Sequence, residues 1–151
     1  MNAAATAPPD RSVVLYVEDD PDHADLVLRS LRRHRPHAHV VHVPDGEAAI
    51  DYLTRTSHGS EERPLLVLLD LRLPKIDGIE VLRTVKQTRA LADIPVVVLT
   101  TSDSETDVTR AYENSVNSYL VKPDDYLTLD AMLKDLGVYW FEWNVQPSGG
   151  H

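Results

Sequence analysis

The 151-residue sequence contains no cysteine, which excludes disulfide bonds, thiolate metal sites and cysteine nucleophiles. It has no apolar run near the roughly 20 residues that a membrane-spanning helix requires. Positive charge is scarce, since 15 lysines and arginines stand against 24 acids. Nucleic acids and anionic membranes are bound chiefly through lysine and arginine, so neither is an expected partner. The lack of cysteine fits a reducing compartment, and we expect a cytoplasmic protein.

The chain length suits one globular domain with a well-buried core. Residues 1–11 are rich in alanine and proline and lack the basic and apolar regions of a secretory signal, so we expect a flexible lead-in there. The domain itself is predicted over residues 12–136. An aromatic C-terminal extension and tail, residues 137–151, completes the chain.

Short apolar runs rich in β-branched residues alternate with amphipathic segments of helical period. The runs predict strands at residues 13–17, 40–43, 65–69, 96–99 and 119–121. Residues 54–64, rich in serine, glycine and glutamate, predict a solvent loop. Five strands alternating with five helices predict an α/β fold, a doubly wound parallel sheet.

Polar residues follow four of the predicted strands. In chain order these residues are Glu18, Asp19 and Asp20, then Asp70, then Thr100 and Thr101, then Lys122 and Pro123. In open parallel sheets the carboxyl ends of the strands form the ligand-binding edge, so we expect these side chains to meet.

Clustered carboxylates repel one another unless a cation compensates them, and a few carboxylates with water suit Mg²⁺. Asp70 follows the most apolar strand, which we expect to be central, and is the best candidate for a nucleophile. Thr100 and Lys122 could each contact an oxygen of a phosphoryl group. These are the parts that phosphoryl transfer requires, namely positioning and neutralisation of charge.

Four ordered segments carry a family resemblance. They are Val17-Glu18-Asp19-Asp20, the run from Leu69 to Gly78 with its D-x-x-L-P-x-x-D-G pattern, Ile94 to Thr100, and Tyr119-Leu120-Val121-Lys122-Pro123. Together they resemble the bacterial response regulator receiver domain over about residues 12–136. The resemblance implies a five-stranded flavodoxin-like receiver fold. It also implies a phosphoacceptor signalling protein rather than an enzyme, with only its own phosphorylation and dephosphorylation as chemistry.

The resemblance further implies a metal site and an acceptor. Asp19 and Asp70 would bind Mg²⁺ directly, Glu18 mostly through water, and Arg72 through its backbone carbonyl. Asp70 would accept the phosphoryl group from a sensor histidine kinase. Arg72 also occupies a position that the family varies to tune dephosphorylation, and so does Ser102.

Three further expectations concern the switch. Lys122 would bridge Asp70 and the phosphate, Thr100 would move toward the phosphoryl group, and Tyr119 would swing into the vacated space. The change would reach a surface near the fourth helix and the fifth strand. In this family the peptide bond between Lys122 and Pro123 would be cis.

Residues 138–145 hold both tryptophans and the only phenylalanine. These aromatics could merely cover the sheet edge or extend the last helix. They could also form an interface, because aromatics are enriched at buried contacts. The extension, the long loop and the lack of an output domain resemble single-domain regulators paired with phytochrome-type histidine kinases. That resemblance implies a homodimer formed through the C-terminal part.

Three other functions remain as alternatives. A phosphatase using an aspartyl phosphate would carry a second acid two residues after the nucleophile, where this chain has Arg72. A flavin-binding module would have a hydroxyl- and glycine-rich loop after the first strand, where Glu18 and Asp19 stand. A degenerate receiver acting as a scaffold would have lost acceptor groups that this sequence retains.

Overall fold

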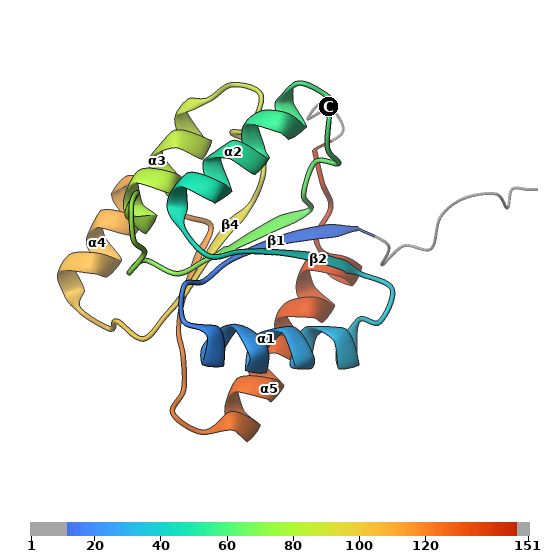
Figure 1. The fold of residues 1–151 in the computed structure, drawn as a ribbon. Helices are drawn as coiled ribbons and strands as arrows, with labels where there is room; N and C mark the ends of the chain where they lie inside the picture. Colours follow the sequence, from blue (N-terminus) through green and yellow to red (C-terminus); the bar gives the residue numbers. More distant parts are fainter. Residues whose placement is uncertain (1–11, 148–151) are drawn as a thin grey trace, which may run out of the picture.

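A computed structural model describes residues 12–147 of the chain (Figure 1). The elements in order are β1 Val13–Val17, α1 Pro21–His34, β2 His39–Val43, α2 Gly46–Ser57, β3 Leu66–Leu69, α3 Gly78–Gln87, β4 Val96–Thr100, α4 Glu105–Glu113, β5 Ser118–Val121, α5 Tyr126–Val138 and the π-helix η1 Tyr139–Trp143. The predicted lead-in 1–11 and residues 148–151 of the predicted tail lie outside the described range. Within that range no helix has the length and apolar character needed to cross a bilayer.

The five strands form one parallel sheet in the order β2-β1-β3-β4-β5. This confirms the predicted doubly wound α/β fold. Each strand begins and ends within about one residue of its predicted bounds. β3 is central, and β1, β3 and β4 are buried along their whole length. Their continuous apolar sequences arise because helices cover both faces of a parallel sheet.

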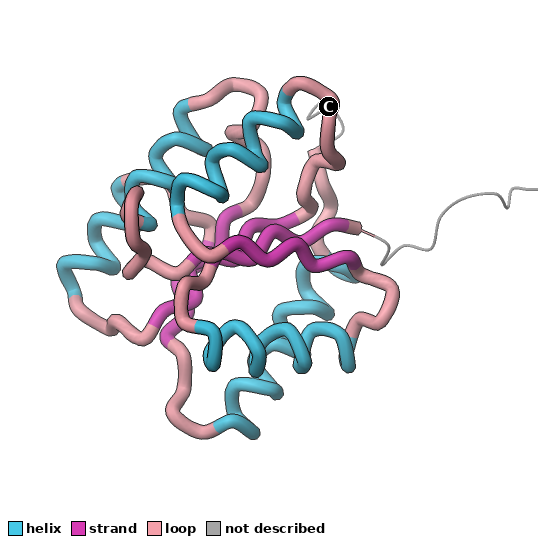
Figure 2. The backbone as a smooth tube through the Cα atoms, in the orientation of Figure 1, coloured by secondary structure: helices cyan, strands magenta, loops and turns pink. Residues whose placement is uncertain are grey.

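The helices form two layers around the sheet (Figures 1 and 2). Leu15 and Val17 of β1 point into the layer of α2, α3 and α4, and Val14 and Tyr16 point into the layer of α1 and α5. The same alternation in β3 and β4 produces two apolar cores, one on each face. The two cores bury both faces of the sheet, and the parallel pairing brings the carboxyl ends of the strands to one edge.

The expected solvent loop over residues 54–64 is wrong at its start, because α2 continues to Ser57. The hydroxyls of Thr54, Thr56 and Ser57 donate to backbone carbonyls one turn back at 2.7–2.8 Å, so these polar residues extend the helix. The helix then stops beside Gly59, whose φ of +80° suits glycine.

A polar contact joins α1 to α5 within the second layer. Asp130 of α5 accepts a hydrogen bond of 2.6 Å from the hydroxyl of Ser30, which is fully buried. Arg33 pairs with the same carboxylate, and His34 lies 3.1 Å from it. The Ser30 hydrogen bond is the main cause that holds the pKa of Asp130 below its usual value.

This contact predicts a pH-dependent loss of stability. Because the pKa of Asp130 is lower in the folded chain, its contribution is present above the unfolded-state pKa of about 4 and is lost as pH falls through the folded-state pKa. Asp130→Asn should therefore lower the urea midpoint at pH 7, and the gap from wild type should shrink as pH falls below about 4. Urea unfolding at a series of pH values measures both. A gap that is constant with pH would contradict the assignment to the carboxylate.

The C-terminal extension begins as a direct continuation of α5. Trp140 and Phe141 of η1 pack against the core that α1 and α5 share. Arg35, at the end of α1, lies with its guanidinium 5.4 Å from the Phe141 ring centre and pairs with Glu142. The first aromatics therefore extend the last helix and cover the core, as one of the two interpretations expected, whereas Trp143 stays 74% exposed.

Candidate functional site

The carboxyl ends of β1, β3 and β5 bring four charged side chains together. Glu18 and Asp19 follow β1, Asp70 follows β3, and Lys122 follows β5. Carboxylate oxygens of the three acids lie within 4.8 Å of one another. Glu18, Asp70 and Lys122 are all buried, and Asp19 is exposed. The sequence prediction that these residues meet is therefore matched by the geometry.

Glu18 is 1% exposed and is the most buried of the three acids. Burial raises the pKa of its carboxyl, and the nearby Asp70 carboxylate raises it further, while Lys122 acts in the opposite direction. Tyr16, two residues earlier on β1, donates a hydrogen bond from its hydroxyl to Glu18 at 3.4 Å. Burial and the same acids raise the pKa of Tyr16, so this phenol remains a neutral donor.

Lys122 is the cation of the cluster. Its ammonium pairs with Glu18 and lies 3.6 Å from Oδ2 of Asp70. It also lies 3.2 Å from Nδ1 of His23, in the first turn of α1. Lys122 pairs with two of the three acids, and the three acids of the cluster outnumber this one lysine, so the site keeps an excess of negative charge.

The loop after Asp70 is held by a close backbone approach. Gly78, at the start of α3, donates to the Leu71 carbonyl at 3.0 Å. A Cβ at residue 78 would lie 2.4 Å from the Asp70 carbonyl oxygen, so only glycine fits there. Asp70 Oδ1 also accepts a hydrogen bond of 3.3 Å from the backbone N–H of Arg72. These contacts fix the position of the Asp70 carboxylate.

Thr100 is the last residue of β4, and Tyr119 lies on the neighbouring strand β5. Thr100 is completely buried, and its hydroxyl oxygen accepts from the Ser102 N–H at 3.4 Å. Tyr119 is half-buried, and its hydroxyl donates to the Ser102 carbonyl at 2.8 Å. Burial is the main cause that raises the pKa of Tyr119. Both side chains thus contact the loop that joins β4 to α4.

The cis peptide bond expected before Pro123 is wrong, because residues 12–147 contain no cis bond. The trans form is the intrinsically favoured one for a bond preceding proline. The chain makes its turn from β5 into α5 with this trans bond, and Asp125 caps the helix.

Sequence reasoning missed three local roles. Asp20, in the acidic run, caps α1 by accepting from the Asp22 N–H at 2.9 Å. His23, in the first turn of α1, contacts Lys122. Asp107 of α4 is buried and pairs with the side chain of Arg72. The position of Asp20 between a strand and a helix was a usable N-cap signal, whereas the contacts of His23 and Asp107 depend on side-chain direction.

The donor set fits a hard divalent cation. Glu18, Asp19 and Asp70 are the only group of three potential ligand residues that converges within residues 12–147. Their oxygens are the ligand type that Mg²⁺ and Mn²⁺ prefer. The excess negative charge left by Lys122 gives a cation a favourable place to bind.

Comparison with known proteins agrees with the fold and the site. The response regulator receiver domain matches residues 14–134, and the chain therefore belongs to this family of two-component signalling proteins. The probable methanogenesis regulatory protein FilR2 of Methanothrix harundinacea (strain 6Ac) is 46% identical over 138 residues, covering 91% of this chain and 89% of FilR2.

Two regulators with solved structures are similar over nearly their whole length. The Mn²⁺-bound form of the response regulator Rcp1 has 40% identity and a TM-score of 0.83, covering 91% of this chain and 99% of that chain. In the sequence comparison, response regulator Rcp1 of Synechocystis sp. is 40% identical to this chain over 137 residues. The phosphorylated cyanobacterial phytochrome response regulator RcpA has 36% identity and a TM-score of 0.85, with the same coverage. The resemblance to phytochrome-linked regulators is thereby confirmed.

Proposed function

We propose that this protein is a phosphoacceptor switch in a two-component phosphorelay, in which Asp70 accepts a phosphoryl group from a histidine kinase. The observation that carries the proposal is the buried Asp70 carboxylate, held by its loop between the other acids and Lys122. In the transfer, an oxygen of Asp70 forms a bond to phosphorus as the N–P bond of the kinase phosphohistidine breaks. The bonding electrons return to the imidazole nitrogen.

Glu18, Asp19, Asp70 and the backbone carbonyl of Arg72 would hold Mg²⁺ in this proposal. When bound, the cation would neutralise charge on a phosphoryl oxygen. The convergence of three carboxylates and the Mn²⁺ in the structure of Rcp1 support a divalent metal here. The Glu18 carboxyl is already paired with Lys122, so it would contact the cation through a water molecule.

Lys122 would pair with a second phosphoryl oxygen. Its ammonium stands 3.6 Å from Asp70, so a short movement brings it into contact with a group attached there. Thr100 would donate its hydroxyl to the phosphoryl group. The loop between β4 and α4 would then shift, and Tyr119, which already bonds to that loop, would follow it. The signal would leave through the surface of α4 and β5, as a covalent charge biases a two-state element.

The donor in this proposal is a phytochrome-type histidine kinase. The phytochrome link of RcpA and the coverage of the whole Rcp1 structure by this chain support that partner class. Because such kinases take their phosphate from ATP, we place the reaction in the cytoplasm. The protein would be a signalling component, with its own phosphorylation and dephosphorylation as its only chemistry.

Phosphotransfer from purified kinases tests this function. A kinase labelled with radioactive ATP and freed of nucleotide should pass its label to the chain within minutes in the presence of Mg²⁺. Addition of a chelator in excess over Mg²⁺ should reduce the transfer to background, because the acids would then repel the incoming phosphoryl group. Kinases of phytochrome type should label it fastest. Equal labelling with and without Mg²⁺ would contradict the metal assignment.

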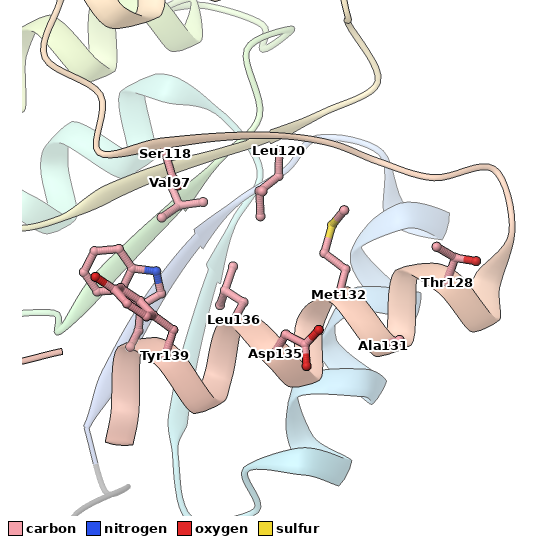
Figure 3. A pocket seen from close by; sticks show the side chains of 10 residues that line it. Val97, Ser118, Leu120, Thr128, Ala131, Met132, Asp135, Leu136 and Tyr139 are labelled. Atoms are coloured by element: carbon pink, nitrogen blue, oxygen red, sulfur yellow. The ribbon is translucent and has the colours of Figure 1, made fainter. Parts of the chain in front are cut away.

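We also propose that two copies of the chain associate through the C-terminal extension. A groove of about 500 Å³ opens between the edge strand β5 and α5, and its lining includes Tyr139 and Trp140 of the extension. Figure 3 shows Tyr139 at one end of it. Leu120 of β5 and Met132 of α5 face each other across it. Trp143 follows Trp140 by three residues in the sequence and is exposed.

A second copy is the occupant that this surface favours. In a two-fold symmetric pair, each copy supplies both the groove and the exposed aromatics, so every apolar surface finds a partner. Burial of a tryptophan in such a contact removes a large apolar area from water.

The mass in solution tests the dimer. Light scattering at micromolar concentration should give about twice the 16.9 kDa of the chain. Trp143→Ser should shift the mass toward that of one chain, because it removes the most exposed aromatic of the extension. Tyr112→Ser is a matched control, since Tyr112 is an aromatic residue that is 54% exposed but lies on α4, outside the lining of the groove. A wild-type protein of single-chain mass would contradict the proposal.

A further inference from the structure

A second carboxylate links the acceptor loop to α4. Asp107, in the first turn of α4, has a side chain that is 8% exposed. One of its oxygens accepts a hydrogen bond of 2.5 Å from the hydroxyl of Ser102 and also pairs with the guanidinium of Arg72. Arg72 is two residues after Asp70, and Ser102 is two residues after Thr100. One buried acid therefore binds a residue from each of the two loops that border the acceptor.

The direction of the Arg72 side chain depends on this acid. The backbone N–H of Arg72 contacts the Asp70 carboxylate, so its side chain starts beside the acceptor. That side chain is 66% exposed and therefore has room to move. Nevertheless its guanidinium pairs with Asp107, while Lys122 is the cation found next to Asp70.

We propose that Asp107 is a positioning residue that holds the Arg72 guanidinium away from a phosphoryl group on Asp70 and so prolongs the phosphorylated state. The inference rests on the proposed function of Asp70. A phosphoryl group carries about two negative charges and attracts arginine strongly. Asp107 competes with it for the guanidinium, from a buried position where charge is weakly screened.

The reaction that this contact slows is hydrolysis. A water oxygen bonds to phosphorus, the bond between phosphorus and the Asp70 oxygen breaks, and the carboxylate is restored. Inorganic phosphate leaves with both protons of the water. A free guanidinium at the phosphoryl oxygens would stabilise charge in this transition state and speed the loss of phosphate.

The half-life of the phosphorylated chain tests the inference. The full-length protein is labelled with acetyl phosphate and Mg²⁺, the donor is removed, and the acid-labile phosphate is followed at pH 7. Asp107→Asn should shorten the half-life about tenfold. This is less than the rate acceleration that one well-placed hydrogen-bond donor typically gives in an active site. The asparagine can still accept from Ser102, so the fold should persist. Asp107→Glu retains the charge and should restore a half-life close to that of wild type.

A double variant separates positioning from a general effect on the site. In Arg72→Gln, the added change Asp107→Asn should leave the half-life unaltered, because the guanidinium on which Asp107 acts is gone. Glu105→Gln removes an exposed acid from the same helical turn and serves as the control for local charge. An equal effect of Asp107→Asn with and without Arg72 would overturn the inference. So would an unchanged half-life in the single variant.

One measurement requires no variant. If Asp107 retains Arg72, nuclear Overhauser contacts between the Arg72 and Asp107 side chains should persist when wild-type protein is phosphorylated, and their loss would overturn the inference. Failure of the wild type to take up phosphate at all would instead contradict the proposed function. The two failures are therefore distinguishable.

Discussion

Replacement of Asp70 by asparagine should reduce phosphorylation of the protein to background. Asparagine matches the shape of aspartate, but its amide lacks the anionic oxygen that forms the acyl phosphate. It can keep the contact with the Arg72 N–H, because its carbonyl oxygen also accepts hydrogen bonds. The loss should therefore come from the missing nucleophile. Uptake of radioactive label from acetyl phosphate, followed by intact mass spectrometry, measures it.

Asp77→Asn is the matched control for this experiment. Asp77 lies in the same loop, and its side chain caps α3 by accepting from the Ile79 N–H at 2.8 Å. Asparagine caps helices equally well, so this variant should be labelled like wild type. If Asp70→Asn were labelled as well as the control, Asp70 would not be the acceptor and another side chain would have to be sought.

Lys122→Met should lower the free energy of unfolding by about 3 kcal/mol in the absence of divalent metal, because it leaves the buried carboxylates of Glu18 and Asp70 without their cation. Addition of Mg²⁺ should restore part of this loss, since a divalent ion among the acids replaces the missing charge. The gain in stability with Mg²⁺ should therefore be larger in the variant than in wild type. Urea unfolding with Mg²⁺ or with chelator measures the difference.

Lys75→Met provides the comparison. Lys75 pairs with Asp45 and Glu47 at 3.6 Å, but its side chain is 59% exposed, so its removal should cost less than about 1 kcal/mol. A Lys122→Met protein as stable as the Lys75→Met protein would mean that the buried acids do not depend on this lysine. A Mg²⁺ response identical to that of wild type would mean that metal and lysine do not share the same charge.

The fold was predictable because its strands are unusually uniform in sequence. Apolar runs such as Val96–Leu99 can be buried on two faces only in a parallel sheet covered by helices, and this restricts the architecture to one class. The error at Thr54–Ser57 has a local cause. Hydroxyl residues suit both loops and helix ends, and only their hydrogen bonds to the preceding turn decide between the two.

The grouping of the site was predictable for a similar reason. Glu18, Asp70 and Lys122 each follow a strand directly, so the topology alone sends them to one edge. The roles assigned to them, and to Thr100 and Tyr119, stay predictions that the experiments above address. Side chains that enter from helices could not be located in this way. His23 and Asp107 reach the acceptor edge through their rotamers, and no sequence period encodes that direction.

Both tryptophans of the chain lie in η1, and Arg35 anchors that segment to the end of α1. The first turn of α1 carries His23, next to Lys122, and the helix of 14 residues is about 21 Å long. Tryptophan fluorescence therefore reports on the end of α1 that lies opposite the acidic cluster. An emission change on phosphorylation would report transmission along the molecule, whereas constant emission would be compatible with a fully phosphorylated sample. Occupancy of the acceptor should accordingly be followed by mass or by label.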